Sequence, residues 1–360
     1  MKSIHSRAYR GRTTLLATVS VLTMLTGGNH ARAGGMTITT PQPDGVTTVP
    51  GQTYLTITGA TAIVTGNVTN PIGVNLAPGV ASNPFGYFNR VQSLYLNKAT
   101  VTGAVVNAGT IQAVNASPTN AANNAEGVHI EGSIITQGLT NSGTVIGNLL
   151  SNTGVGNYAT GVLIETTQFS GGIRNSGEII GTVNSTSMDR NSQANGLSAR
   201  ISGPQNVASV FNATNTGIII ATATATATQP HIDSFGEDFS LFGSRFTGVI
   251  DNRGTVTATT MAVAGTLPNA ISNFSAIGAE LFLGSGGAFT GTVDNSGVIL
   301  ASGTIPLSIT AASGTHTSTT KVFGSYAYIA GGFDTRSSST FTGAITNAGS
   351  IGASLLSTNS

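Results

Sequence analysis

The chain of 360 residues contains no cysteine and no tryptophan, and only 8% of its residues are charged. Without cysteine, the fold cannot depend on the disulfides that stabilise many small exported domains. Apolar residues at the three- and four-residue spacing of an amphipathic helix are also missing, and alanine is the only strong helix former that is abundant. These absences, together with the 48 glycines, predict an all-β protein.

Positive charge is scarce beyond the first 33 residues. That segment holds five of the 14 basic residues, which leaves nine basic against 13 acidic residues in the rest of the chain, a balance of about −4. A basic surface for nucleic acid is therefore not expected.

Residues 1–33 have the features of a secretory signal peptide. Basic residues from Lys2 to Arg12 precede the apolar run Leu15–Leu25, and Ala31 and Ala33 are the small residues of a cleavage site. The alternative is a buried N-terminal helix; a membrane span is disfavoured because the apolar run is shorter than the roughly 20 residues that a bilayer needs. We expect an exported mature chain that begins near Gly34.

A short phrase, Asn-x-Gly-x-Ile/Val-x-Ala/Gly, recurs seven times after residue 100. The asparagines that align are Asn107, Asn141, Asn175, Asn215, Asn252, Asn295 and Asn347. The glycines two positions later are Gly109, Gly143, Gly177, Gly217, Gly254, Gly297 and Gly349. The apolar residue and the small residue follow at further steps of two, so the phrase has the alternation of a β-strand.

The Asn-x-Gly pair predicts a bend between two short strands, because glycine tolerates positive φ and asparagine accepts left-handed geometry. If the repeats stack at this bend, the asparagine amides can hydrogen bond to one another along the stack. The alternative is that each asparagine stabilises only its own turn. We expect these asparagines and glycines to be structural residues.

The spacing between the asparagines varies from 34 to 52 residues. A parallel β-helix accommodates such variation, because insertions leave at the corners of the coils. A β-sandwich array is the alternative and would require regular connections. Second apolar phrases at Gly127–Ile134, Gly161–Phe169 and Ile277–Gly284 suggest more than one coil per repeat. With about 20 residues per coil and about 4.8 Å between strands, the stack would be roughly 70 Å long.

The predicted fold is thus an all-β, right-handed parallel β-helix that follows a signal peptide. Its parts are the signal peptide (1–33), an N-terminal capping region with the first coils (34–100) and the β-helix repeats (101–360). Within the second part, Tyr54–Val68 is expected to form strands and Pro71–Phe88 a loop, and the alternating Ala221–Thr228 is expected to continue a strand.

With its leader and its Cys-free Asn-Ser-Gly-x-Ile-x-Ala phrases, the chain resembles the passenger domain of a bacterial autotransporter. The resemblance covers about residues 34–360 and implies export, display at the outer surface and a role in adhesion or self-association. It also implies attachment to the outer membrane through a C-terminal translocator barrel. The closing series of about ten-residue amphipathic strands that such a barrel needs is missing from this chain, so we expect the sequence to stop within the passenger.

Candidate residues for chemistry are few. The strongest acidic cluster is Asp233, Glu237 and Asp238, and Asp251 and Asp294 share one repeat position, with Arg245 and Arg253 close in sequence. Polysaccharide lyases and hydrolases built on β-helices use such groups, but solvated carboxylates are the expected explanation here.

Other signals for a site are weaker. His129, His231 and His316 lack metal-ligand spacing and are expected at the surface or in loops. Ser285 lacks the surroundings of a nucleophile, and Ala330–Thr335 is one imperfect calcium-repeat phrase. We expect no catalytic, cofactor or metal site.

The expected function is an exported, non-catalytic structural or adhesive rod. Its partners would be a second copy or a host or matrix surface ligand, with no nucleic acid, and it would be located at the cell surface, at the outer membrane or outside the cell. The alternative is a carbohydrate-active β-helix enzyme.

Overall fold

The computed structural model describes residues 34–77, 88–116, 122–151, 156–166, 168–185, 191–202, 208–226, 231–263, 273–284, 286–306, 319–329 and 339–358. These residues belong to one compact unit, Ala33–Ser360. The predicted signal peptide lies outside the described residues. Within them, no helix is long and apolar enough to cross a membrane.

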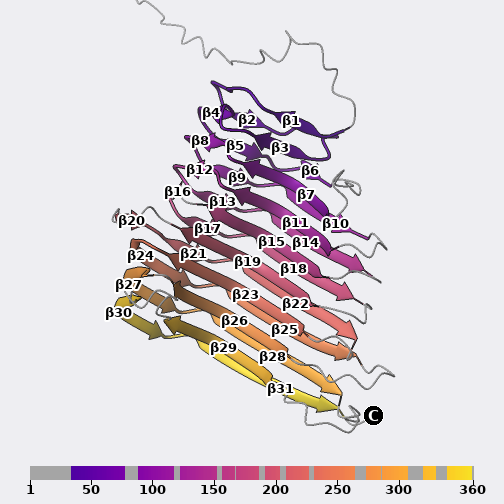
Figure 1. Ribbon diagram of the computed structural model, residues 1–360, viewed down its shortest axis with the longest axis vertical. Helices are drawn as coiled ribbons and strands as arrows, with labels where there is room; N and C mark the ends of the chain where they lie inside the picture. The colour runs from indigo at the N-terminus through magenta and orange to yellow at the C-terminus, as the bar shows by residue number, and fades with distance from the viewer. Residues whose placement is uncertain are drawn as a thin grey trace, which may run out of the picture. The chain divides into compact units, whose positions relative to one another are not determined.

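The described chain is built from β-strands in four sheets, which we number I to IV in the order in which each coil meets them (Figure 1). Sheet I contains β1 (Met36–Ile38), β3 (Leu55–Thr58), β7 (Phe88–Asn97), β11 (Ala122–Glu131), β15 (Asn157–Thr166), β19 (Ser192–Ser202), β23 (His231–Phe242), β26 (Asn273–Gly284) and β29 (Thr319–Ile329). Sheet II contains β4 (Ile63–Val64), β8 (Thr100–Val101), β12 (Ile134–Ile135) and β16 (Gln168–Phe169).

The other two sheets carry the repeated phrase. Sheet III contains β2 (Val46–Thr47), β5 (Val68–Asn70), β9 (Val105–Asn107), β13 (Leu139–Asn141), β17 (Ile173–Asn175), β20 (Ala208–Val210), β21 (Ala213–Asn215), β24 (Arg245–Asn252), β27 (Ala288–Asn295) and β30 (Thr340–Asn347). Sheet IV contains β6 (Asn75–Leu76), β10 (Thr110–Asn115), β14 (Thr144–Ser151), β18 (Glu178–Ser185), β22 (Ile218–Thr226), β25 (Thr255–Val263), β28 (Val298–Pro306) and β31 (Ser350–Thr358).

Successive strands of every sheet are parallel neighbours, so the described chain is a parallel β-helix, as predicted. This parallel pairing excludes the β-sandwich alternative, because sandwiches are built from antiparallel sheets. The segments that β1 to β6 contribute join the same four sheets as the later repeats. The strands predicted within Tyr54–Val68 are confirmed, and Ala221–Thr226 lies in β22 as predicted; part of Pro71–Phe88 falls outside the described residues.

Each repeat forms one coil, so the prediction of more than one coil per repeat was wrong. Asn107 pairs directly with Asn141, and Asn141 pairs with Asn175. The second apolar phrases belong to the same coil as the asparagine, since they supply the sheet I strands β11, β15 and β26. Nine successive strands of sheet III, at about 4.8 Å apart, extend over roughly 40 Å and not 70 Å.

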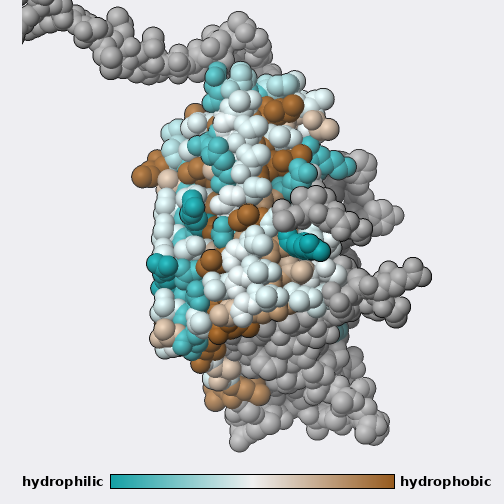
Figure 2. All heavy atoms as spheres, turned by 90° about the vertical axis from the view of Figure 1, so that its left-hand side faces the viewer, coloured by the Kyte–Doolittle hydropathy of each residue, from teal (hydrophilic) through white to brown (hydrophobic). Residues whose placement is uncertain are grey.

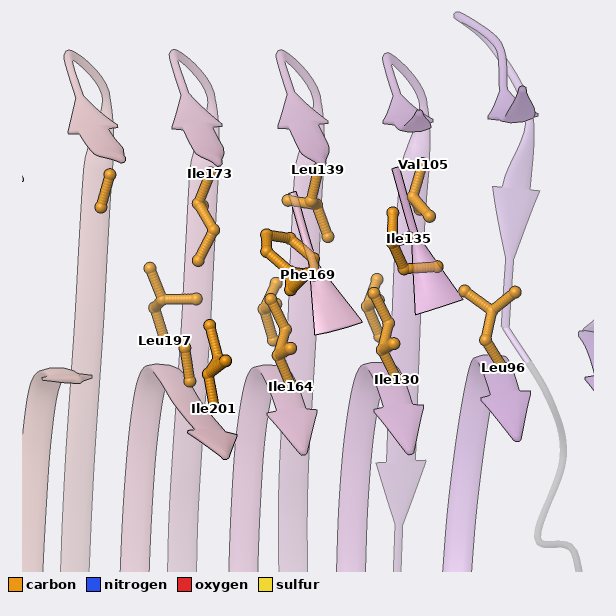
Figure 3. Close-up of a cluster of buried hydrophobic side chains, with 14 of the residues drawn as sticks. Leu96, Val105, Ile130, Ile135, Leu139, Ile164, Phe169, Ile173, Leu197 and Ile201 are labelled. Carbon is orange, nitrogen blue, oxygen red and sulfur yellow. The ribbon is translucent and has the colours of Figure 1, made fainter. Parts of the chain in front are cut away.

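Alternate residues of the strands point into the coil and stack on their counterparts. Leu96, Ile130 and Ile164 form one such row in sheet I, and all three are buried (Figure 3). The apolar residue four positions after each asparagine forms another row in sheet IV, buried from Ile111 to Ile299. The core is therefore a set of short-range contacts between neighbouring coils, which add up along the stack.

The small residue six positions after each asparagine points inward at a place where two sheets are close. Ala113, Ala221 and Ala258 are fully buried. At Gly181, a Cβ would lie 1.9 Å from the carbonyl oxygen of Asn195 in sheet I. No side chain fits at Gly181, and the other copies hold glycine or alanine at this position. Ala353, in the last coil, is exposed.

The bend at Asn-x-Gly is present, but its glycine is required for a different reason from the one predicted. None of the repeat glycines is among the positive-φ residues of the described chain. Instead, a Cβ at Gly143 or Gly177 would lie 2.0 Å from the carbonyl oxygen of the repeat glycine in the preceding coil. The backbone of one corner thus rests directly on the corner below, and any side chain would separate them.

Replacing Gly254 by alanine should therefore destabilise the stack. The new Cβ would lie 2.1 Å from the carbonyl oxygen of Gly217, and such overpacking costs about 1–3 kcal/mol or more. The free energy of unfolding in urea would measure the loss. Gly352→Ala is the matched control, because its Cβ would meet only Leu300 Cδ2, at 3.0 Å. An equal loss of unfolding free energy in Gly254→Ala and Gly352→Ala would contradict the explanation by close backbone contact.

Candidate functional site

The repeat asparagines form one continuous column of side-chain hydrogen bonds. From Asn107 onward, each Nδ2 donates to the Oδ1 of the asparagine in the next coil at 2.7–2.9 Å, as far as Asn347. Asn70, which the sequence analysis missed, donates to Asn107 in the same way, and the hydroxyl of Thr48 donates to Asn70. Asn70 is followed by proline and lacks the glycine of the later copies, so the sequence gave no signal for it.

The column lies in a buried environment and is almost fully hydrogen bonded. Asn107 to Asn295 are at most 6% exposed. Asn107 Nδ2 also donates to the backbone carbonyl oxygen of Thr144, at 3.3 Å. The backbone carbonyl of Asn107 accepts hydrogen bonds from the N–H groups of Ser142 and Gly143. Buried amides are stabilising only when their partners are in place. The repeat asparagines therefore face each other and the backbone, and their amides are not directed at a ligand.

The predicted acidic cluster is dispersed by the fold. Asp238 lies on the outer face of sheet I, where Ser198 and Ser240 donate hydrogen bonds to its carboxylate, each at 3.0 Å. Glu237 is its neighbour in sequence but sits in the row of core residues between Leu197 and Ala279. Asp233 precedes Gly236, at which the strand bends. The three carboxyls do not converge on one point.

The second acidic pair is also not a catalytic pair. Asp251 and Asp294 are direct neighbours in adjacent strands, so their separation is that of one strand spacing, about 4.8 Å, and not the 10 Å that two coils per repeat would give. Arg253 Nε lies 2.7 Å from Asp251 Oδ2, while Thr346 donates to Asp294. Arg245 is exposed at the start of β24, six residues before Asp251.

The histidine prediction needs a larger correction, because His129 is completely buried on the outer face of sheet I. The long strands of this sheet bend at a column of glycines, which includes Gly127, Gly161 and Gly196. Gly127 and Val128 both point inward, since a Cβ at Gly127 would meet Val145 and Val128 is in the core. Two successive inward residues make the outer face concave, and the flanking outward residues Glu126 and His129 lean together.

Glu126 and His129 are the centre of a charged network in this concave face. Glu126 Oε2 lies 2.9 Å from His129 Nδ1, and the amide of Gln92 donates to Glu126 at 2.6 Å. On the other side of the imidazole, Glu165 Oε2 lies 3.5 Å from Nε2. Arg90 is 4.0 Å from Glu126 and Arg200 is 3.5 Å from Glu165. Strands β7, β11, β15 and β19 thus each contribute to one polar cluster.

The pKa values of this network suit an ion pair better than proton transfer. Burial alone would raise the pKa of Glu126, but the charge and hydrogen bond of His129, with Arg90 and Gln92, lower it to about 2. Burial would likewise lower the pKa of His129, but Glu126 and then Glu165 raise it to about 9. At neutral pH the histidine is protonated and cannot act as a base, and Glu126 is ionised and cannot act as an acid.

Glu237 is the opposite case. Burial raises its pKa to about 7, a value suitable for acid–base chemistry, but its side chain lies in the hydrophobic core and does not face the concave surface. Burial also raises the pKa of Asp238, against the opposing effects of Arg200, Ser198 and Ser240. The group with a suitable pKa and the cluster with converging side chains are therefore on opposite faces of sheet I.

The remaining predicted positions add no site within the described chain. His231 is half-buried at the start of β23. No group of three or more histidine, aspartate or glutamate side chains among the described residues is arranged to hold a metal ion. His316, Ser285 and Ala330–Thr335 lie outside the described residues.

No protein-family model matches this chain, and neither the curated proteins nor the solved structures contain a significant match to it.

The asparagine column predicts that Asn252→Ala destabilises the fold. The change removes the acceptor of Asn215 and the donor to Asn295, and buried groups left without partners cost about 1–3 kcal/mol. Urea unfolding would measure the loss. Asn184→Ala, at an exposed position of β18, is the control and should change the stability by less than about 0.5 kcal/mol. Equal effects of the two changes would argue against a stabilising column.

Glu237 predicts a dependence of stability on pH. Its pKa in the folded chain, about 7, lies above its ordinary value of 4.5. The protonated form is favoured by folding, so its stabilising effect is complete below pH 4.5 and is lost as the pH rises through 7. The loss amounts to about 3 kcal/mol. Unfolding free energies between pH 4 and pH 8 should fall less in Glu237→Gln than in the wild type.

The matched control for this experiment is Glu178→Gln, which makes the same change from carboxyl to amide at an exposed position of β18. Parallel profiles for the wild type and Glu237→Gln would contradict the prediction.

Proposed function

We propose that the protein is an exported, non-catalytic structural or adhesive rod that acts at the cell surface, similar to the passenger domain of a bacterial autotransporter. The observation that supports this most directly is the use of the repeated residues. The asparagine of each repeat bonds to its counterpart in the next coil, and the glycine packs against the corner of the preceding coil. A protein whose repeated positions all serve the stack is suited to present an extended surface, as other solenoid proteins do.

The proposed location rests on the leader. Residues 1–33 have the order of charge, apolar run and small residues found in secretory signal peptides. The absence of cysteine is compatible with a location outside the cytoplasm, because the hydrogen-bonded column and the stacked core can supply the stabilisation that disulfides give other exported proteins. The partner of such a rod would be a host or matrix surface ligand or a second copy of the chain.

The arrangement of the acidic residues favours this proposal over a carbohydrate-active enzyme. Glycosidases need two carboxyl groups that face the same substrate. Here Glu237 points into the core, while Asp238 points outward and is held by two serines. Glu126 and His129 are both charged at neutral pH, so they are suited to stabilise the concave face as an ion pair and not to transfer a proton.

We expect cells that express the full chain to export it and to cleave it near Gly34, and beads coated with the mature protein to adhere to matrix-coated surfaces. Cell fractionation, the mass of the mature chain and bead counts after washing would measure this. Retention inside the cell with an intact leader would contradict the location. Beads that bind no better than beads coated with an unrelated protein would contradict the adhesive role.

Asp238→Ala separates the two functions. An adhesive rod should bind equally well with this change, because the carboxylate is buried and hydrogen bonded to Ser198 and Ser240. Cleavage of a polysaccharide by the wild type that Asp238→Ala abolishes would replace the proposal by the enzymatic alternative.

A further inference from the structure

The outer face of sheet IV carries almost no charge. In β10, β14, β18, β22, β25 and β28, the row of register partners that begins at Ile111 and ends at Ile299 is buried. The residues that alternate with this row along each strand therefore face outward. Among the outward side chains described there, Glu178 is the single ionisable group. The outer face of sheet I, by contrast, carries the Glu126–His129 network with Arg90 and Arg200.

The same face carries a row of half-buried isoleucines over three successive coils, which Thr257 separates from Leu300. Ile146, Ile180 and Ile220 are register partners in three successive strands, and Leu300 occupies the same row two strands later. The large apolar side chains of this face that are 39–48% exposed are Leu150, Ile218, Met261, Val263 and Leu300. On the side that carries β4, β8, β12 and β16, apolar residues occur in small groups separated by pale residues (Figure 2). The exposed apolar side chains of sheet IV come from four of its strands, β14, β22, β25 and β28.

Hydroxyl groups form the row beside the isoleucines. Thr182, Thr222 and Thr259 are register partners. The hydroxyl oxygens of Thr259 and Ser302 are 3.1 Å apart. A hydroxyl both donates and accepts a hydrogen bond, so a row of hydroxyls can bind an identical row. Exposed apolar surface framed by neutral polar groups is the composition of an interface core, from which charge is depleted.

The size of the face suits a stable dimer. Six strands at about 4.8 Å, each with about eight residues at 3.3 Å, give a surface of roughly 750 Å². A specific interface buries about 800 Å² on each partner. Two flat sheets can pack face to face at about 10 Å, as in sandwiches.

We propose that the outer face of sheet IV is a self-association surface, which pairs with the same face of a second copy of this chain around a two-fold axis. In such a pairing each group meets groups of the same face, so a face with charge of one sign would repel itself. A neutral, hydroxyl-rich and apolar face does not, and its single carboxylate, Glu178, lies at the start of its strand. The inference rests on the proposed function, which includes a second copy among the partners, and it names the face that would bind that copy.

The test is sedimentation equilibrium of the purified mature chain from micromolar to millimolar concentration. The wild type should form a closed dimer, and added salt should leave its dissociation constant nearly unchanged because no charges are paired. Leu300→Lys places two charges at each two-fold interface and should raise the dissociation constant at least about tenfold. Circular dichroism of each variant would confirm that it is folded.

Two matched variants separate this face from other surfaces. Val249→Lys introduces the same charge at a valine of β24 that is 40% exposed, and it should leave the dimer intact. Ile351→Lys changes an exposed residue of the last coil. If association ran end to end through that coil, Ile351→Lys would abolish it, Leu300→Lys would not, and larger open assemblies would be present.

Besides end-to-end association, three outcomes would overturn the proposal. A monomer at every concentration would remove the second copy as the partner. An equal effect of Val249→Lys would show that the face is not specific. A monomer that binds phosphatidylcholine vesicles, with binding lost in Leu300→Lys, would assign the face to a lipid surface instead.

Discussion

The hydrogen bond from one asparagine amide to the next is the interaction on which the rest of this structure depends. It sets the register of neighbouring coils, because the amides meet only when Asn141 lies over Asn107 and under Asn175. Once that register is fixed, the inward residues of sheets III and IV, on either side of the corner, stack on their counterparts in the neighbouring coils. The glycine two positions later allows the corners to approach closely enough for the bond to form. Register and close approach are therefore specified by the same three-residue phrase.

The fold could be predicted because its information is local and repeated. Alternation at steps of two marks strands, and the recurrence of Asn-x-Gly marks the corner where the strands meet. The number of coils per repeat could not be read in this way, since the phrases of sheet I lie at varying distances from the asparagine. The role of the glycine was also ambiguous. A glycine is required either by positive φ or by a close neighbour, and one sequence does not distinguish these causes.

The candidate site was less predictable, because its residues come from different coils. Glu126, His129 and Glu165 meet only after β11 and β15 are placed side by side. A partial signal existed: Gly127 and Gly161 open similar phrases, and alignment on them places His129 beside Leu163 and Glu131 beside Glu165. The opposite directions of Glu237 and Asp238 depend on the bend at Gly236, which the alternation of the strand does not reveal.

The asparagine column also has a direction. Every amide nitrogen points toward the later coils and every amide oxygen toward the earlier ones, beginning at the hydroxyl of Thr48. The amide dipoles therefore add along the axis, and each bond polarises the next. A coil that joins the growing stack on its later side is met by N–H donors, whereas one that joins on the earlier side is met by oxygen acceptors. The two ends of the helix are thus electrically distinct, although their sheets and their core are built from the same repeat.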